Sequence, residues 1–469
     1  IDDDDHVFVF VPHRLVWDGG SVDLLINELS VIYQAQLSGV PHDLPELTVT
    51  HGDYAEWYLN WLASTQFEDQ LSFWKKRFAD APPPRALRTD MPRGAGMTGQ
   101  GSTHWMAVDG ALTRQLRSVA RSHEVTLNML ALGVFALLLS SVADARSLVV
   151  ATPVRSRQFP EVETVMGLFG NLLPLPVEVD PRQTLGEFVQ YLKHQLVSAM
   201  DNQQVPFERF AGEPEFSGRA KGDGLYQVLF SFEDARERSL AIGPLRHRQL
   251  PVSQRGATED LGLWLTEAPD GLEGGLTYNA DIYRRETAAA LRNRYVELLQ
   301  RVAEHPKDTL AALVAAGTSP DAVYLRHLSR SQTAEPAAGA REERAAGVAA
   351  ETSPPAVLVS AQLQLAQIWA AVLKIKLSDM RPSDNFFDLG GDPLLAMRVI
   401  QLAERASGFR TAPPRYVFEN LGQLASRDAA SALGEARSGG GGARLKDAAG
   451  RTLLGRMFSG WGKAVRSNS

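Results

Sequence analysis

A histidine, an arginine and an aspartate lie close together near the start of the chain. His13 and Arg14 follow an apolar run that ends in a proline, and Asp18 comes four residues after Arg14, before two glycines. An imidazole can accept a proton near neutral pH, and a nearby carboxylate can orient it. A polar turn at the end of a strand is a common place for a site. The alternative is a plain strand–turn–helix in which the aspartate is structural.

The elements around this turn follow from the hydrophobic pattern. Residues 1–11 are predicted to form a strand, and residues 21–37 an amphipathic helix that ends near Gly39. Residues 51–63 and 66–78 are predicted to form two further helices. The second has four apolar residues on one stripe, which we expect to be core rather than a ligand site: Phe67, Leu71, Trp74 and Phe78.

From residue 103 to residue 304, strands and helices alternate, which indicates an α/β domain. Strands are predicted at residues 103–108, 147–154, 175–179, 226–232, 261–267 and 272–279. Helices are predicted at residues 111–123, 127–142, 185–200 and 285–304, the second of them capped by Thr126.

The composition changes after this domain. Residues 317–357 are rich in Ala, Ser, Pro, Glu and Arg without periodicity, which predicts a linker. Helices at residues 362–376, 393–406 and 421–433 predict a small all-α domain. Glycines at residues 439–442 then precede a basic tail.

Composition limits the class of protein. The 469 residues carry a net charge of −7 and are 44% hydrophobic, which is typical of globular proteins and gives no basic field for nucleic acid. The absence of cysteine excludes disulfides, thiolate metal sites and a cysteine nucleophile, and we predict no metal site. The most apolar run, residues 127–142, is too short and too interrupted to span a bilayer. We therefore expect a soluble, cytoplasmic protein.

Several motifs, taken in order, resemble the condensation domain of nonribosomal peptide synthetases. Residues 13–19 match its H-H-x-x-x-D-G motif except at the second histidine. Four further segments resemble its Y-x-D-Y-A-x-W, G-T-P-V-x-x-R, G-x-F-x-N-T-L and H-Q-D-x-P-F-E blocks: residues 51–61, 151–157, 166–173 and 202–208. Residues 385–395 are close to the carrier-domain signature F-F-x-L-G-G-H/D-S-L. Several blocks in the right order are a stronger signal than any single motif.

The resemblance implies a two-lobed, chloramphenicol-acetyltransferase-like α/β fold followed by a small all-α carrier bundle. We assign the condensation domain to residues 1–316, with its C-terminal lobe at about 100–316, the linker to 317–357, the carrier domain to 358–435 and a Gly-rich, basic tail to 436–469. The family's reaction is amide formation between a carrier-bound acyl thioester and an amine, and its cofactor is 4′-phosphopantetheine. The implied partners are carrier domains and acyl thioesters of other synthetase modules.

Three departures from the family pattern matter as much as the match. The additional strands and helices that the family has before the histidine motif are not in this sequence, so we expect an incomplete N-terminal lobe. The second histidine, which the family uses in catalysis, is Arg14. The carrier serine that would receive phosphopantetheine is Pro393, directly after Asp392.

These replacements change the chemistry. A guanidinium, whose pKa is above about 12, cannot act as a base, so Arg14 could only orient groups or stabilise negative charge. His13 remains, but neighbouring residues at a strand end tend to point to opposite faces. Pro393 has no hydroxyl, although proline is tolerated at the first position of a helix. We predict that phosphopantetheine is not attached.

The other residues of the site are expected to support it. Asp18 is expected to form a salt bridge with a nearby arginine, such as Arg157. Gly19 and Gly20 are expected to provide backbone freedom and close approach. The resemblance gives Asn171 a supporting position as well.

Three functions stay open. The chain is an impaired condensation–carrier segment, an inactive scaffold or remnant with the same folds, or an acyltransferase that uses His13 and a free acceptor. The tail at residues 443–469 has six basic residues against one acidic residue. It could dock to an acidic partner or a membrane surface, with a disordered tail as the alternative.

Overall fold

The chain forms two compact units, residues 1–351 and 352–469. The computed structural model describes residues 6–81, 87–94, 97–213, 216, 225–236, 242–245, 256–315, 319–331, 360–382, 384–386, 389, 393–407 and 420–425. The basic tail, for which a docking role and disorder both stay open, lies outside the described residues.

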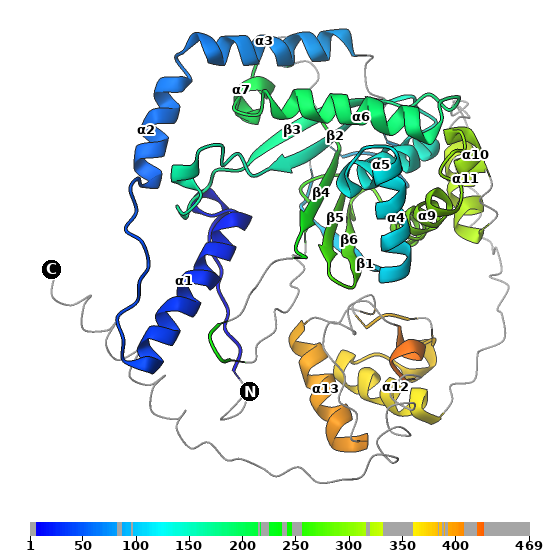
Figure 1. Ribbon diagram of the computed structural model, residues 1–469. Coiled ribbons are helices and arrows are strands. Elements are labelled where there is room, and N and C mark those ends of the chain that lie inside the picture. The colour runs from blue at the N-terminus through cyan, green and yellow to red at the C-terminus, as the bar shows by residue number, and fades with distance from the viewer. Residues whose placement is uncertain are drawn as a thin grey trace. The chain divides into compact units, whose positions relative to one another are not determined.

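A six-stranded mixed sheet organises the first unit (Figure 1). Its strands are β1 (Gly101–Asp109), β2 (Ser147–Val154), β3 (Asn171–Glu178), β4 (Val228–Asp234), β5 (Leu261–Ala268) and β6 (Gly271–Asn279), in the order β1-β6-β5-β4-β2-β3. The pairs β2–β4 and β4–β5 are parallel, and the other three pairs are antiparallel. Each of the six predicted strands is present, β2 with the predicted bounds and the other five with shifted ends.

Four long helices pack against this sheet and against one another: α4 (Gly110–Ser122), α5 (Leu127–Ala143), α6 (Leu185–Met200) and α9 (Arg285–Glu304). Helix α5 is buried along most of its length because α4, α6 and α9 all contact it. Thr126 caps α5 as predicted, accepting a hydrogen bond from the backbone N–H of Met129. On β5, Leu263 and Leu265 point into the core, whereas Trp264 on the opposite face is 41% exposed.

The short elements in the described ranges that were not predicted include η2 (Pro160–Val162), α7 (Phe207–Ala211), α10 (Leu310–Ala315) and α11 (Pro320–Ser331). Helix α11 packs against α9 and α5 and buries Ala322 and Leu325. It lies inside residues 317–357, so the linker prediction is wrong for this stretch. Its apolar stripe is too short to stand out from the surrounding composition, and burial against α9 decides its structure.

Three helices precede the sheet in the sequence: α1 (Gly19–Ser38), α2 (His51–Trp61) and α3 (Thr65–Asp80). Helix α1 ends at Gly39, whose φ of 70° lies in the left-handed region, as the helix-stop prediction requires. The predicted stripe of α3 is buried, and α3 packs against α7.

The strand predicted at residues 1–11 is not found in its described part. Residues 6–13 carry no regular secondary structure before the turn η1 (Arg14–Val16), and residues 1–5 lie outside the described residues. The alternating valines and phenylalanines favour a strand, but a strand is stable only beside a neighbour. None of the described residues pairs with this segment.

The second unit contains α12 (Ser360–Leu373), η3 (Leu377–Asp379) and α13 (Pro393–Ser407). Its core includes Trp369 and Phe386, whose ring centroids lie 5.1 Å apart. Residues 421–425 are helical, and the remainder of the helix predicted at 421–433 lies outside the described residues.

No single helix within the described ranges is long and apolar enough to cross a membrane. Helices α4 and α5 meet the length and composition criteria only as a pair, and that pair is bent by 97°.

Candidate active site

Asp18 is the N-cap of helix α1 and satisfies one of the free N–H groups of its first turn. One carboxylate oxygen, Oδ1, accepts hydrogen bonds from the backbone N–H of Ser21 at 2.8 Å and from the Ser21 hydroxyl at 2.7 Å. The other oxygen, Oδ2, accepts from the backbone N–H of Phe169 at 3.2 Å. An aspartate at the N-cap stabilises a helix through this kind of bond. Asp18 therefore fixes both the start of α1 and the loop before β3.

Ser21 is fully buried and joins the same two segments. Its Oγ accepts a hydrogen bond from the N–H of Gly167 at 2.9 Å. The Gly167 carbonyl also lies 2.9 Å from this Oγ, so the single hydroxyl proton can go either to this carbonyl or to Asp18. The hydroxyl thus links the first turn of α1 to residue 167.

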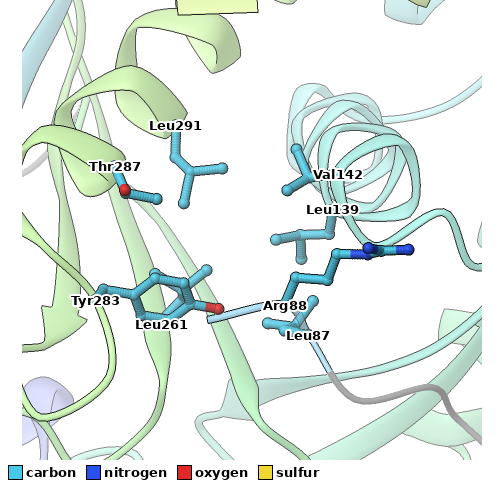
Figure 2. Close-up of a pocket in the computed structure, with 8 residues that line it drawn as sticks. All are labelled: Leu87, Arg88, Leu139, Val142, Leu261, Tyr283, Thr287 and Leu291. Carbon is cyan, nitrogen blue, oxygen red and sulfur yellow. The ribbon is translucent and has the colours of Figure 1, made fainter. Parts of the chain in front are cut away.

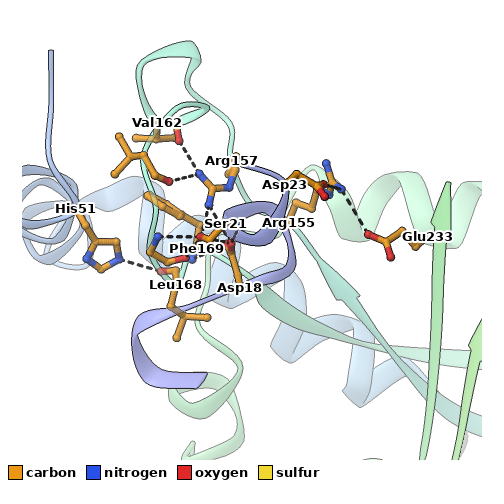
Figure 3. A network of polar contacts seen from close by, with 12 residues as sticks. Asp18, Ser21, Asp23, His51, Arg155, Arg157, Val162, Leu168, Phe169 and Glu233 are labelled. Carbon is orange, nitrogen blue, oxygen red and sulfur yellow. Dashed lines mark hydrogen bonds and ion pairs between the residues drawn. The ribbon is translucent and has the colours of Figure 1, made fainter. Parts of the chain in front are cut away.

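Arg157 is the cation of the site, and its side chain is only 4% exposed. Nη2 lies 2.9 Å from Asp18 Oδ1, so the predicted ion pair is present. Nη1 donates to the carbonyls of Val162 at 2.7 Å and Val165 at 2.6 Å, and the guanidinium lies 4.2 Å from the centroid of the Phe169 ring. Figure 3 shows this network converging on the arginine.

The Asp18 carboxyl stays ionised in this setting. Burial by itself would raise its pKa, but the hydrogen bonds from Ser21 and Arg157 outweigh burial and hold the pKa below the ordinary aspartate value. A carboxylate that accepts from three fixed donors, and from the Ser21 hydroxyl when its proton points there, is poorly suited to take up a further proton. Asp18 therefore serves as a brace for the motif.

His13 lies at the N-cap of η1 with its side chain exposed. Its Nδ1 accepts a hydrogen bond from the backbone N–H of Leu15 at 3.2 Å. A neutral imidazole that accepts at Nδ1 carries its proton on Nε2. In this arrangement Nε2 can donate a proton but cannot accept one.

The glycines of the motif differ from each other. A Cβ on Gly20 would lie 3.0 Å from Arg157 Nε, which is the expected close approach. A Cβ on Gly19 would meet nothing within 4 Å, and Gly19 does not have a positive φ. The prediction that Gly19 provides backbone freedom and close approach is therefore wrong.

Arg14 is the first residue of η1, and the structure does not describe its side chain.

His51, the first residue of α2, contacts the loop before β3 that Asp18 also contacts. Its Nε2 donates to the carbonyl of Leu168 at 3.1 Å, and its ring packs edge-on against Phe169 with centroids 5.1 Å apart. A Cβ on Gly167 would lie 2.2 Å from the His51 Cδ2, so only glycine fits at this position. Segment 51–61 is thereby brought onto segment 166–173.

Asn171 supports a neighbouring loop rather than the Asp18 carboxylate. Its Nδ2 donates to the carbonyls of Gln203 at 2.8 Å and Val205 at 2.7 Å, and its Oδ1 accepts from the N–H of Phe207 at 3.1 Å. The same loop receives hydrogen bonds from Tyr58 of α2, to Gln204, and from Trp74 of α3. The four sequence blocks and the His13 motif thus lie in one connected network.

Arg155 marks the outer edge of this network (Figure 3). Its guanidinium lies 3.6 Å from Asp23 on α1 and 3.8 Å from Glu233 on β4, and its side chain is 65% exposed. Solvent weakens such pairs, so this contact adds little stability.

A cavity in the core does not provide a substrate site (Figure 2). It is lined mainly by aliphatic side chains such as Leu139, Leu261 and Leu291, with Tyr283 beside them. Its space of about 10 Å³ is enough for about one water molecule. Among the residues that the structure describes, no group of three or more His, Asp or Glu could hold a metal ion.

The position at which the family attaches phosphopantetheine does not offer a hydroxyl. Pro393 is the first residue of α13, and attachment at this position requires a hydroxyl that proline lacks. Proline suits the first turn of a helix because its missing N–H would have no partner there. Asp392 lies outside the described residues. Pro393 therefore preserves the start of the helix but offers no oxygen to which phosphopantetheine could be attached.

Comparison with known proteins agrees with this geometry. The family model "Condensation domain" matches residues 1–320. The chain belongs to the condensation-domain family. The model "Phosphopantetheine attachment site" matches residues 364–427, so this condensation domain is followed by a carrier domain. The predicted family and α/β condensation fold are confirmed. The incomplete N-terminal lobe stays a prediction, as do the predicted domain boundaries apart from the linker stretch that forms α11.

The condensation region resembles parts of much longer synthetases. It is 30% identical over 308 residues to tyrocidine synthase 3 of Brevibacillus parabrevis, covering 66% of this chain and 5% of that protein. It is 32% identical over 313 residues to phosphinothricin tripeptide synthetase PhsC of Streptomyces viridochromogenes, covering 66% of this chain and 29% of that protein. The chain therefore spans only a small part of these relatives.

Solved structures resemble the condensation region as well. The X-domain from teicoplanin biosynthesis matches with a TM-score of 0.57 and 26% identity, over 64% of this chain and 69% of that one. The first condensation domain of the calcium-dependent antibiotic synthetase, in complex with a substrate analogue, matches with a TM-score of 0.51 and 20% identity, over 64% of each chain. At that identity the second likeness shows the fold alone.

The residues missed from the sequence are Ser21, His51 and Gly167. Ser21 lies three positions after Asp18, which is the spacing of an N-cap and the residue that it holds, so the cap pattern could have indicated it. His51 and Gly167 act through a contact between distant segments, and no local pattern signals that contact.

Proposed function

We propose that this chain is a condensation–carrier segment of a nonribosomal peptide synthetase in which amide formation is impaired. The ancestral reaction joins a carrier-bound acyl thioester to an amine. The observation that supports impairment is a contrast within the motif. Asp18 has its hydrogen bonds to α1, Arg157 and the loop before β3, whereas neither His13 nor Arg14 offers a free base. Carrier domains of other synthetase modules are the proposed partners.

The reaction needs more than positioning. As the amine attacks the thioester carbonyl it must lose a proton, and negative charge develops on the carbonyl oxygen. Arg14 replaces the histidine of the family motif and cannot take that proton. His13 could take it on Nε2 only after giving up its hydrogen bond with the Leu15 N–H. Both features favour positioning without proton transfer.

A substitution at position 14 tests the proposal. We expect Arg14→His to raise amide formation from a synthetic pantetheine thioester and an amine at least tenfold over the unaltered chain, within the range of general-base effects. Arg14→Gln is the matched control, because it removes the charge without adding a base. Wild-type turnover that His13→Ala abolishes would contradict the proposal and favour an acyltransferase that uses His13 with a free acceptor.

The carrier unit is proposed to be unmodified. Pro393 leaves no hydroxyl to attack the pyrophosphate of coenzyme A, and the sequence holds no serine from residue 386 to residue 404. Intact-mass measurement after incubation with coenzyme A and a promiscuous phosphopantetheinyl transferase should show no added pantetheine arm.

A scaffold without catalysis is the second candidate. One matching structure, at 26% identity and a TM-score of 0.56, is a complex of the X-domain and OxyB from teicoplanin biosynthesis, so a similar fold is found bound to another protein. A scaffold predicts no turnover in either the unaltered chain or Arg14→His. Restored turnover in Arg14→His would argue against it.

A further inference from the structure

The face of the sheet opposite the core carries an exposed tryptophan. Trp264 on β5 is 41% exposed, whereas its neighbours Leu263 and Leu265 are buried in the core. Because side chains alternate between the two faces of a sheet, Gly262 and Thr266 lie on the same face as Trp264. We call this side the outer face of the sheet.

Glycines beside Trp264 determine where its indole lies. A Cβ on Gly262 would lie 3.0 Å from Trp264 Nε1, so the nitrogen edge of the indole occupies the space that a side chain at this position would need. Gly275 is the partner of Trp264 on β6 and contributes no side chain beside the ring. The ring is therefore placed by its neighbours and keeps an accessible aromatic surface on the outer face.

Two carboxylates flank Thr266 in the next row of the outer face. Glu273 on β6 and Glu233 on β4 are both register partners of Thr266, so the three side chains share this face. Glu273 forms no ion pair with any residue that the structure describes. Partial burial and the nearby Asp270 carboxylate raise the pKa of Glu273 above the ordinary glutamate value. A cation beside Glu273 would offset this unfavourable charge.

The outer face adjoins the network around Asp18 (Figure 3). Arg155 lies two positions before Arg157 in the chain, and its guanidinium lies 3.8 Å from Glu233. The same guanidinium lies 3.6 Å from Asp23 on α1. The outer face at β4 is therefore the side of the sheet that meets α1, the helix that begins in the motif.

On the basis of the proposed function, which requires an amine, we propose that the outer face of β4, β5 and β6 binds that amine as an arylalkyl ammonium ion, with its ring on Trp264 and its charge toward Glu273. An alkyl amine is protonated at neutral pH, as lysine is. Trp264 and Glu273 are diagonal neighbours on the β5–β6 pair, so their positions lie about 7–8 Å apart. A ring and an ammonium group joined by two carbons suit such a pair, and a cation near an indole is also attracted to its ring.

A motif without a free base is compatible with this site. An ammonium ion beside Glu273 is not a nucleophile, because a proton occupies the lone pair of its nitrogen. Binding in this form needs no proton transfer by His13 or Arg14. The chain therefore holds the amine, although the step that would make the amine reactive is impaired.

Isothermal titration calorimetry of the full chain with β-phenethylamine tests this site without any thioester. The unaltered chain should bind the amine. Trp264→Ala and Glu273→Gln, at unchanged circular dichroism, should each weaken binding at least about threefold, which is the size of one cation–π contact or one partly exposed ion pair. Trp57→Ala, which removes a 37% exposed tryptophan from α2, and Glu304→Gln at the end of α9 are the matched controls. Both controls should leave binding unchanged.

2-Phenylethanol has the same ring and chain without the charge, so it should bind at least about threefold more weakly than β-phenethylamine. Equal binding of the alcohol and the amine would overturn the proposal. Unchanged affinity in Trp264→Ala or Glu273→Gln, or no binding of the amine by the unaltered chain, would also overturn it. None of these outcomes depends on turnover by Arg14→His, which tests whether amide formation is impaired. The amine site can therefore fail while the proposed function stands, and the reverse.

Discussion

Replacing Asp18 by asparagine should cost far more stability than its place in a surface turn suggests. The asparagine would keep an oxygen for the N–H of Ser21 but would remove the charge that faces Arg157, a side chain only 4% exposed. Breaking a buried ion pair by removing one partner costs about 3–5 kcal/mol, because the remaining charge is uncompensated. Arg157 keeps its bonds to the Val162 and Val165 carbonyls, so we expect the lower end, about 3 kcal/mol.

Urea unfolding of the full chain, followed by tryptophan fluorescence, measures this loss. Asp23→Asn is the matched control on the same helix, since Asp23 lies 3.6 Å from an arginine that is 65% exposed, and we expect a change of about 0–1 kcal/mol. Hydrogen exchange should show the Asp18→Asn effect in α1 and in residues 160–170. Equal losses for the two variants would refute the reasoning that burial makes the Asp18 pair different.

The contribution of Asp18 to the free energy of unfolding depends on pH with a definite sign. The pKa of Asp18 is lower in the folded chain than in the unfolded chain, so its ionised form contributes stability that is complete above the unfolded pKa, near 4. That contribution is lost as the pH falls below this value toward the folded pKa. The stability difference between the unaltered chain and Asp18→Asn should therefore narrow below about pH 4.

Three further substitutions test other contacts of the site and of the carrier unit. Ser21→Ala should lose about 1–3 kcal/mol in urea unfolding, because the N–H of Gly167 loses its acceptor while buried. Gly167→Ala should lose about 1–3 kcal/mol, since its Cβ would lie 2.2 Å from His51, whereas Gly19→Ala, with open space around it, should change stability by less than about 0.5 kcal/mol. Pro393→Ser should gain one pantetheine arm in intact-mass measurement after incubation with coenzyme A and a transferase; failure to gain it would mean that more than the hydroxyl is missing.

The long elements of the fold could be predicted because their pattern is local. Helices α6 and α9 have the predicted bounds because each carries apolar residues at the helical period. Strand β2 also has its predicted bounds, because it is a short, continuous apolar run rich in β-branched residues. Helix α11 was missed inside the predicted linker because its burial against α9 decides its structure. The segment at residues 7–11 has a strand-like sequence, but a strand needs a neighbour that the sequence of the segment does not specify.

The sequence by itself determined the order of the long helices and of the sheet strands, the family and the two replaced chemical groups at Arg14 and Pro393, because these depend on residue identity and on spacing along the chain. The sequence predicts the pair of Asp18 with Arg157, but only the tertiary structure decided which other side chains meet there. It made Ser21 the centre of the contact between Asp18 and Arg157. It also showed that His13 uses Nδ1 to cap its own turn. These contacts depend on distances across the fold, which no local period encodes.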